Sequence, residues 1–233
     1  MNVPRLHDTP IAAIGERVRG AVAVGGRTFL FDRPAALDKL FDHPAVRAAY
    51  AADEYIPYWA DPWPAGRMLA EAVLKEPWDD YPGEKPLRAL ELGCGLGLTG
   101  IAALSAGLRV TFSDIDEGAV RMAGENARLN GFHHFDTVAY DLRSPPRGVT
   151  FPVVLGADVM YESRMTEPLV EFLDAVLAPD GLALIADPDR LSARPFHSLA
   201  SRGGFTVQLK KAKVGEKGSQ TKGYIYRVTR RVE

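Results

Sequence analysis

One stretch of the chain, residues 87–100, constrains the fold more than any other. It opens with a short apolar run that ends at Leu92, continues with three alternating glycines, and restarts as an apolar helical run at Ile101; the glycines are Gly93, Gly95 and Gly97. A strand that breaks into glycines and resumes as a helix brings its backbone close to a bound molecule, and the helix offers free N–H groups there. The stretch therefore predicts a strand–loop–helix unit that binds a ligand.

Two ligand classes fit this unit, and a turn without any ligand is the third reading. Gly95, Gly97 and Gly100 spell G-x-G-x-x-G, the dinucleotide fingerprint. An additional Gly93 precedes it, and Glu91 stands at the end of the strand, where a carboxylate can accept hydrogen bonds or pair with a positive ligand. The form Glu-x-Gly-x-Gly-x-Gly resembles motif I of the class I S-adenosylmethionine (AdoMet) methyltransferases. That resemblance favours AdoMet over NAD.

Composition excludes several other classes. The 233 residues are 46% hydrophobic and 25% charged with a net charge of −2, which is ordinary for a globular chain and gives no general affinity for polyanions. The single cysteine, Cys94, excludes an internal disulfide and a multi-cysteine zinc site. No apolar run reaches the length of a membrane span, and the first residues lack the apolar core of a signal peptide. We therefore expect a cytoplasmic protein.

The N-terminal part reads as a small cap. Residues 21–24 and 27–31 flank Gly25-Gly26 and predict a hairpin, a helix is expected from Pro34 with an interruption at Pro44, and another from about Ala65 to Leu74. The polar segment 75–85 contains Pro-Gly and marks a boundary. We predict an N-terminal cap at 1–80 and a ligand-binding core at 81–233.

Strands and helices alternate through the core, which predicts a doubly wound, Rossmann-like α/β sheet. The expected strands are 87–92, 109–114, 135–140, 151–157 and 182–186, and the expected helices are about 98–106, 117–129, 166–177 and 193–203. Two further strands, 205–214 and 224–232, are joined by a polar loop and should pair antiparallel. The methyltransferase resemblance implies seven strands with an antiparallel last strand.

Acidic residues follow four successive strands, at the edge where open α/β sheets bind ligands. They are Glu91, Asp114, Asp141 and Asp158. Asp114 is placed to accept from ribose hydroxyls and Asp141 from an adenine amino group, whereas Asp116 is better explained as a helix cap. Each acid alone also fits a cap or loop role. Together they suit a ligand with a sulfonium and an ammonium group and disfavour a pyrophosphate.

The segment 55–66 combines aromatic residues with prolines, which keep it out of a regular helix or central strand. Its aromatic residues are Tyr55, Tyr58, Trp59 and Trp63. One interpretation is a rigid loop that seals the sheet edge. The other is an aromatic wall beside a cation, since aromatic faces attract sulfonium and ammonium groups.

A second resemblance narrows the family. Asp158-Val-Met-Tyr161 resembles the Asp-x-x-Tyr element of the seven-strand protein-lysine methyltransferases, the methyltransferase-16 group, and differs from the Asn-Pro-Pro-Tyr signature of enzymes that methylate nucleic-acid amino groups. The run from Trp59 to Gly66 looks like the Trp-containing segment that precedes motif I in that group. The chain is most similar to the branch that methylates lysine in the electron transfer flavoprotein β subunit, although the acid Asp61 between the tryptophans departs from what that branch leads us to expect.

The resemblance implies AdoMet as cofactor and direct displacement of its methyl by a lysine amine. The candidate catalytic residues are Asp158 and Tyr161, and Trp59 is the candidate substrate contact. The candidate cofactor-binding residues are Trp63, Glu91, Gly93, Gly95, Gly97, Asp114, Asp141, Leu142 and Ala157. Alternatives are a small-molecule or RNA methyltransferase on the same fold, an AdoMet-binding protein without transfer activity, and, more distantly, an NAD-dependent oxidoreductase.

Other conspicuous residues are given structural roles. Cys94 lacks a visible base and reads as a packed residue, and adjacent His133 and His134 do not make a metal site, so none is expected. Residues 210–231 contain eight Lys or Arg and one Glu. For this basic segment, a solvated edge is the first interpretation, a docking face for an acidic protein the second, and nucleic-acid binding the third. We expect a protein substrate, acidic or a flavoprotein subunit, with no membrane contact.

Overall fold

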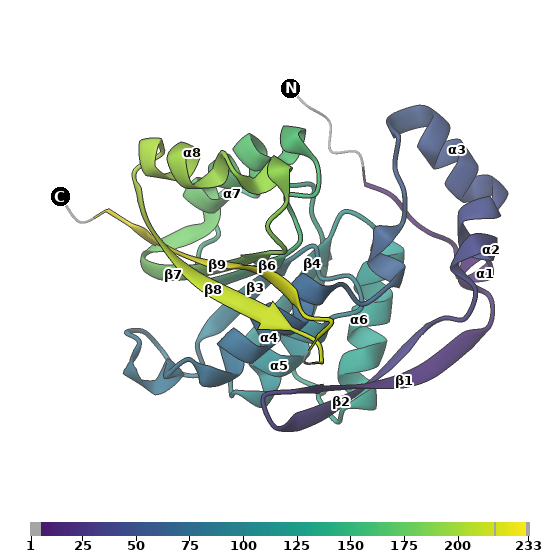
Figure 1. The fold of residues 1–233 in the computed structure, drawn as a ribbon, viewed down its shortest axis with the longest axis horizontal. Coiled ribbons are helices and arrows are strands. Elements are labelled where there is room, and N and C mark those ends of the chain that lie inside the picture. Colours follow the sequence, from purple (N-terminus) through teal and green to yellow (C-terminus); the bar gives the residue numbers. More distant parts are fainter. Residues whose placement is uncertain (1–5, 217, 232–233) are drawn as a thin grey trace.

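A computed structural model describes residues 6–216 and 218–231. Within them lies a seven-stranded sheet with the strand order β5-β4-β3-β6-β7-β9-β8 (Figure 1). The strands are β3 (Arg88–Leu92), β4 (Arg109–Asp114), β5 (Asp136–Ala139), β6 (Phe151–Ala157), β7 (Leu177–Asp187), β8 (Phe205–Val214) and β9 (Thr221–Arg230). Neighbours from β5 to β7 are parallel, and β9 runs antiparallel to β7 and β8. The predicted fold class is confirmed.

The central strands are buried on both faces because their apolar runs are continuous. Alternate residues of β6 enter different clusters: Val153 and Leu155 pack into one and Val154 into the other. The first cluster is covered by α4 (Pro64–Lys75), α5 (Leu98–Ser105) and α6 (Glu117–Leu129), and the second by α7 (Thr166–Val176) and α8 (Phe196–Arg202). Figure 1 shows these two helix sets on opposite sides of the sheet.

Element boundaries agree closely with the sequence, with two clear errors. The helix expected from Pro34 begins only at Leu37, because Pro34 is the last residue of the preceding strand. The structure gives β4, β6, β8 and α6 the residue ranges that were predicted. Strand β7, however, begins at Leu177 directly after α7, five residues before the expected Leu182. Leu177 pairs with Phe151, and the register shifts before Leu182 pairs with Val153. Such an irregularity tolerates Pro179, which lacks the N–H that a regular ladder needs.

The N-terminal part is α1 (Ile11–Ile14), β1 (Arg17–Val24), β2 (Arg27–Pro34), α2 (Leu37–Asp42) and α3 (Pro44–Asp53). The hairpin turns at Gly25 and Gly26, as predicted, and both have positive φ. Asn126 of α6 and Asn130, the C-cap of that helix, hold the hairpin. The Asn126 amide accepts from Asp32 N and donates to Asp32 O, and Asn130 does the same with Leu30. The two side-chain amides thus form hydrogen bonds with the backbone of β2, as a neighbouring strand would. They fix the N-terminal cap to the core.

Both parts also share apolar packing. Phe29 and Phe31 of β2 belong to the same buried cluster as Met122 and Ala127 of α6. The segment between the parts contains a short 3-10 helix, η2 (Trp78–Asp80), with Trp78 buried. The division at residues 80 and 81 therefore stays a prediction drawn from composition. In the part of the chain that the structure describes, no helix combines the length and the apolar character needed to cross a membrane.

Candidate active site at the carboxyl edge of the sheet

A pocket of about 420 Å³ opens where β3, β4 and β6 end. Helix α3, the 3-10 helix η1 (Tyr58–Ala60) and the loops after β6 and β7 supply its other walls. Ten of the twelve predicted site residues line it: Trp59, Trp63, Glu91, Gly93, Gly95, Asp114, Leu142, Ala157, Asp158 and Tyr161. Gly97 and Asp141 are not among its lining residues.

The glycine loop has the backbone that its sequence requires. Gly93, Gly95 and Gly97 have φ values of 58°, 51° and 87°, a left-handed region that only glycine adopts without strain. A Cβ on Gly95 would lie 3.2 Å from the carbonyl oxygen of Trp59, so the loop is pressed against η1. Gly97 has a different function: it begins α5, and a Cβ there would meet Ala123 at 3.1 Å.

Glu91 is the most unusual group of the pocket. It is only 3% exposed, and its Oε2 atom has no hydrogen-bond partner. Burial raises the pKa of this carboxyl to about 8, and the nearby N–H groups of Thr99 and Gly100 oppose the increase only in part. Because one oxygen of this buried carboxyl lacks a hydrogen-bond partner, Glu91 keeps acceptor capacity for a cation at a ligand-sized pocket.

Asp114 holds the loop from the neighbouring strand. Its Oδ2 accepts from Gly95 N at 3.0 Å and its Oδ1 from Asp116 N at 3.2 Å. Burial nevertheless raises the pKa of the Asp114 carboxyl to about 6. Because these bonds orient the carboxylate at the pocket wall, it has acceptor capacity left for a ligand hydroxyl.

Asp116 does more than cap α6. Its Oδ1 accepts from Gly118 N, which confirms the predicted cap, and also from Thr9 N at 2.9 Å. Its Oδ2 accepts from the Trp59 indole at 3.2 Å and from the hydroxyl of Tyr55. One fully buried carboxylate thus ties the N-terminal segment and the aromatic segment to the core. Sequence reasoning missed this because the partners lie up to 107 residues away.

Asp158 is paired, and its partner was not predicted. Arg190, after β7, donates from Nε to Asp158 Oδ1 at 2.6 Å and from a terminal nitrogen to Oδ2 at 2.8 Å. Its guanidinium also lies 6.0 Å from the ring centre of Trp63. The four acids were found by looking for polar residues after each strand. The same search after the fifth expected strand would have found Arg190.

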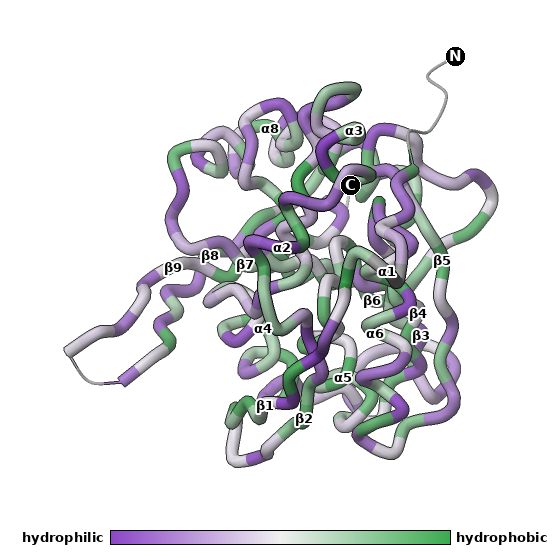
Figure 2. The backbone as a smooth tube through the Cα atoms, turned by 90° about the vertical axis from the view of Figure 1, so that its right-hand side faces the viewer, coloured by the Kyte–Doolittle hydropathy of each residue, from purple (hydrophilic) through white to green (hydrophobic). Residues whose placement is uncertain are grey.

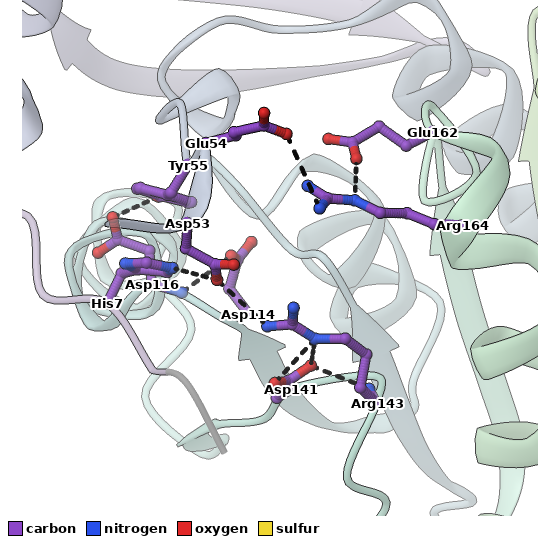
Figure 3. A network of polar contacts seen from close by, with 10 residues as sticks. All are labelled: His7, Asp53, Glu54, Tyr55, Asp114, Asp116, Asp141, Arg143, Glu162 and Arg164. Atoms are coloured by element: carbon purple, nitrogen blue, oxygen red, sulfur yellow. Dashed lines mark hydrogen bonds and ion pairs between the residues drawn. The ribbon is translucent and has the colours of Figure 1, made fainter. Parts of the chain in front are cut away.

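Asp141 is likewise engaged within the protein (Figure 3). Arg143 donates from Nε to both of its carboxylate oxygens, at 2.9 and 3.1 Å, and reaches Asp53 of α3 at 3.6 Å. His7 contacts the same Asp53 oxygen at 3.8 Å. Arg143 lines the pocket where Asp141 does not. The adenine-binding role of Asp141 stays a prediction, and Arg143 is a second residue that the sequence did not reveal.

Aromatic rings surround the pocket mouth. Tyr58 meets Trp63 and Tyr161 edge-on, with ring centres 6.1 and 5.8 Å apart. Tyr161 is 41% exposed, and loss of solvent around its hydroxyl raises the pKa of this phenol to about 12. It therefore stays protonated at neutral pH and acts as a packing or donor group, not as a base.

Comparison with known proteins agrees with this geometry. Residues 60–195, which contain the glycine loop, the acidic strand ends and Arg190, match the family described as lysine methyltransferase. The chain belongs to the lysine methyltransferase family. Both the class I methyltransferase resemblance and the methyltransferase-16 assignment are thereby confirmed.

Individual known proteins resemble the chain in sequence or in fold. The chain is 35% identical over 136 residues to the electron transfer flavoprotein β subunit lysine methyltransferase of Xenopus laevis, covering 58% of this chain and 53% of that protein. The chain thus spans about half the length of the curated relatives it matches. The ribosomal protein L11 methylase of Lactobacillus delbrueckii superposes with a TM-score of 0.54 at 22% identity, over 70% of this chain and 77% of the other. N-methyltransferase NodS of Bradyrhizobium japonicum, in complex with S-adenosyl-L-homocysteine, gives a TM-score of 0.53 at 16% identity, over 72% and 100%.

We predict that Glu91 makes the ligand-free protein less stable as pH rises. Its folded-state pKa of about 8 lies above the ordinary 4.5, so the stability it contributes is complete below about pH 4.5 and is lost as pH rises through 8. Urea denaturation should give Glu91→Gln and wild type similar unfolding free energies at pH 5, with the variant more stable by roughly 2–4 kcal/mol at pH 8.

The control is Glu84→Gln, which changes an exposed acid and should follow wild type at every pH. A constant difference between Glu91→Gln and wild type from pH 5 to pH 8 would show that Glu91 does not titrate in this range.

Proposed function

We propose that this protein transfers a methyl group from S-adenosylmethionine to the ε-amine of a lysine in a protein substrate. The observation that carries the proposal is the buried Glu91, with Oε2 unpartnered, at the wall of a pocket whose glycine loop and acidic strand ends lie within the lysine methyltransferase match. A pocket of this kind favours a cationic ligand.

The residues present fit AdoMet. Glu91 offers an acceptor to its ammonium group, Asp114 to its ribose, and the loop Gly93 to Gly95 gives its backbone close approach. Leu142 and Ala157 line the pocket as apolar contacts, and Trp63 adds an aromatic face. When bound, AdoMet supplies the methyl carbon, which bonds to the attacking amine as the carbon–sulfur bond breaks and leaves its electron pair on sulfur.

The chain's own residues hold and orient the acceptor. The Asp158 carboxylate stands at the end of β6 and can accept a hydrogen bond from a neutral amine, while Tyr58, Trp63 and Tyr161 border the way in. Their contribution is alignment of the nucleophile, which supplies several kcal/mol without a covalent intermediate. The proton that the ammonium loses before attack passes to water.

Charge separates this proposal from its rivals. A dinucleotide would bring a pyrophosphate next to Glu91 and Asp114, which is unfavourable in a partly buried pocket. A small-molecule or RNA acceptor on the same fold is the second candidate. No sequence feature or contact singles out such an acceptor, whereas the family match favours protein lysine.

For the substrate we propose an acidic protein, with the electron transfer flavoprotein β subunit as the first to test, because the matched relatives carry that name. A basic hairpin supports this choice. In the β8–β9 pair Lys213 lies directly opposite Lys222, and both are exposed. Like charges in cross-strand register are unfavourable, and neither lysine has an ion pair among the described residues.

The hairpin is placed to act at the pocket side of the sheet. Tyr224 pairs with Asp187 at the end of β7, so Lys222 lies beyond the carboxyl edge. Figure 2 shows the hairpin extending from the body of the molecule. An acidic surface around the target lysine is the chemistry that would complement it. The cytoplasm stays the location predicted from the sequence.

We predict that wild-type protein labels the purified flavoprotein β subunit when supplied with tritiated AdoMet, and that a target-lysine-to-arginine substrate is not labelled. Asp158→Ala should reduce transfer at least ~100-fold because the amine loses its acceptor, while AdoMet affinity changes less than about threefold. Asp180→Ala, an exposed acid at the start of β7, is the control. Unchanged turnover in Asp158→Ala would remove this residue from the catalytic group.

The same assay, run on a protein-rich lysate digested with protease or nuclease, distinguishes acceptors. Label that is lost with nuclease and retained with protease would replace protein by RNA. Label in small solutes alone would favour the small-molecule alternative, and binding without any transfer would identify a silent AdoMet-binding protein.

We also predict that the double variant Lys213→Glu/Lys222→Glu raises KM for the flavoprotein subunit by roughly fivefold or more at low salt, with KM for AdoMet unchanged. The matched control is Lys39→Glu/Lys75→Glu, which makes the same change in net charge on helices α2 and α4. Equal effects of the two doubles would mean that net charge, and not the hairpin, sets the affinity.

A further inference from the structure

The ion pair between Asp158 and Arg190 closes one wall of the pocket. Both carboxylate oxygens are engaged, at 2.6 and 2.8 Å, and the Asp158 side chain is only 7% exposed. The Arg190 side chain is 36% exposed and lines the pocket, and its guanidinium lies over Trp63 at 6.0 Å from the ring centre. Arg190 is therefore in the place where a lysine stem would approach Asp158.

The backbone around the pair is built to hold it. Asp158 itself has a φ of 59° and Asp189 one of 64°; with Glu54 these are the left-handed non-glycine residues of the described chain. Asp158 N donates to Ala186 O at 2.9 Å, which continues the β6–β7 ladder, and Arg190 N donates to Asp187 Oδ1 at 2.7 Å. Such conformations persist only where surrounding contacts fix them, so the ion pair is an ordered part of the site.

Lysine methylation sets a chemical problem that this pair answers. The amine attacks only when neutral, yet an isolated carboxylate beside it stabilises the ammonium form and raises the amine pKa. A carboxylate and a guanidinium together carry no net charge, and the carboxylate of such a pair keeps free lone pairs for a hydrogen bond. It can orient the amine without keeping it protonated.

We propose that Arg190 is a positioning residue that neutralises Asp158, so that the carboxylate holds the substrate lysine as a neutral amine. The proposal rests on the proposed function and extends it to a residue outside the predicted site. It requires that the charge of Arg190, and not only its contacts, be needed for turnover.

The other charged groups near the pair do not replace it. Glu162 and Arg164, after β6, bind each other, and Arg164 also reaches Glu54 of the α3 end at 4.0 Å. Asp187 is fully buried behind Arg190 N, and burial raises its pKa to about 6. Other ionisable groups that line this part of the pocket are Tyr58 and Asp61 near η1, Tyr161 after β6, Asp114 at the end of β4 and Glu91 at the end of β3. None of these groups is a cation, and the two other arginines that line the pocket are engaged elsewhere: Arg164 by Glu162 and Arg143 by Asp141.

The first test is the pH dependence of kcat with the flavoprotein β subunit as substrate. In Arg190→Gln the unpaired Asp158 should keep the amine protonated, so the rising limb of kcat should move up by about one pH unit or more. Arg190→Lys keeps the charge and should retain the wild-type midpoint even if kcat falls. Asp158→Asn/Arg190→Gln, which removes both charges, should return the midpoint toward wild type.

The second test needs no turnover and uses n-butylamine as a probe of the lysine side chain. At pH 7 the probe is a cation, so Arg190→Gln should bind it several-fold more tightly than wild type, and the double variant should lose that gain. Trp63 fluorescence or calorimetry measures the binding, and thermal unfolding confirms that each variant is folded.

Two results would overturn the proposal: an Arg190→Gln variant whose kcat midpoint does not move, or one that binds n-butylamine no better than wild type. Either would give Arg190 a packing role only. If wild type methylates no protein at all, the proposed function fails, and the n-butylamine comparison still decides whether Arg190 neutralises Asp158.

Discussion

Burial of carboxyl groups at one edge of a parallel sheet is the constraint on which this site depends. Six acids lie at or just beyond the carboxyl ends of β3, β4, β5, β6 and β7, and each is at most 9% exposed: Glu91, Asp114, Asp116, Asp141, Asp158 and Asp187. Charge in such surroundings is unfavourable unless hydrogen bonds or cations compensate it. Acids whose charge is compensated by groups of the protein itself build the site. Acids without such compensation are open to a ligand.

Three acids are compensated within the protein. Asp116 accepts hydrogen bonds from backbone and side chains of three segments, Asp141 is bound by Arg143, and Asp158 is bound by Arg190. These contacts join α3, η1 and the loops into the rim of the pocket. Burial raises the pKa of Glu91, Asp114 and Asp187 above ordinary values despite their backbone contacts. Of these three, Glu91 and Asp114 line the pocket. A cationic methyl donor would supply the compensation that they lack.

The sequence was sufficient for what depends on local pattern. The glycine loop, the apolar runs of β4 and β6, and the acids after the strands are all visible along the chain, because strand burial and strand-end position are properties of short segments. The Asp116 cap was predicted for the same reason. Long-range partners were not: Arg190 lies 32 residues from Asp158, and Thr9 lies 107 residues from Asp116. Nothing in a single sequence says which arginine meets which acid, and the early start of β7 depends on a register shift against β6.

The most direct test of the central claim is whether AdoMet binding releases a proton from Glu91. Calorimetry at pH 7 in buffers of different ionisation enthalpy counts protons exchanged on binding. Because a cation in the pocket should ionise a carboxyl whose pKa is about 8, AdoMet should release roughly one proton from wild type and close to none from Glu91→Gln. Binding without proton release in wild type, or tighter binding of NADH than of AdoMet, would contradict the account.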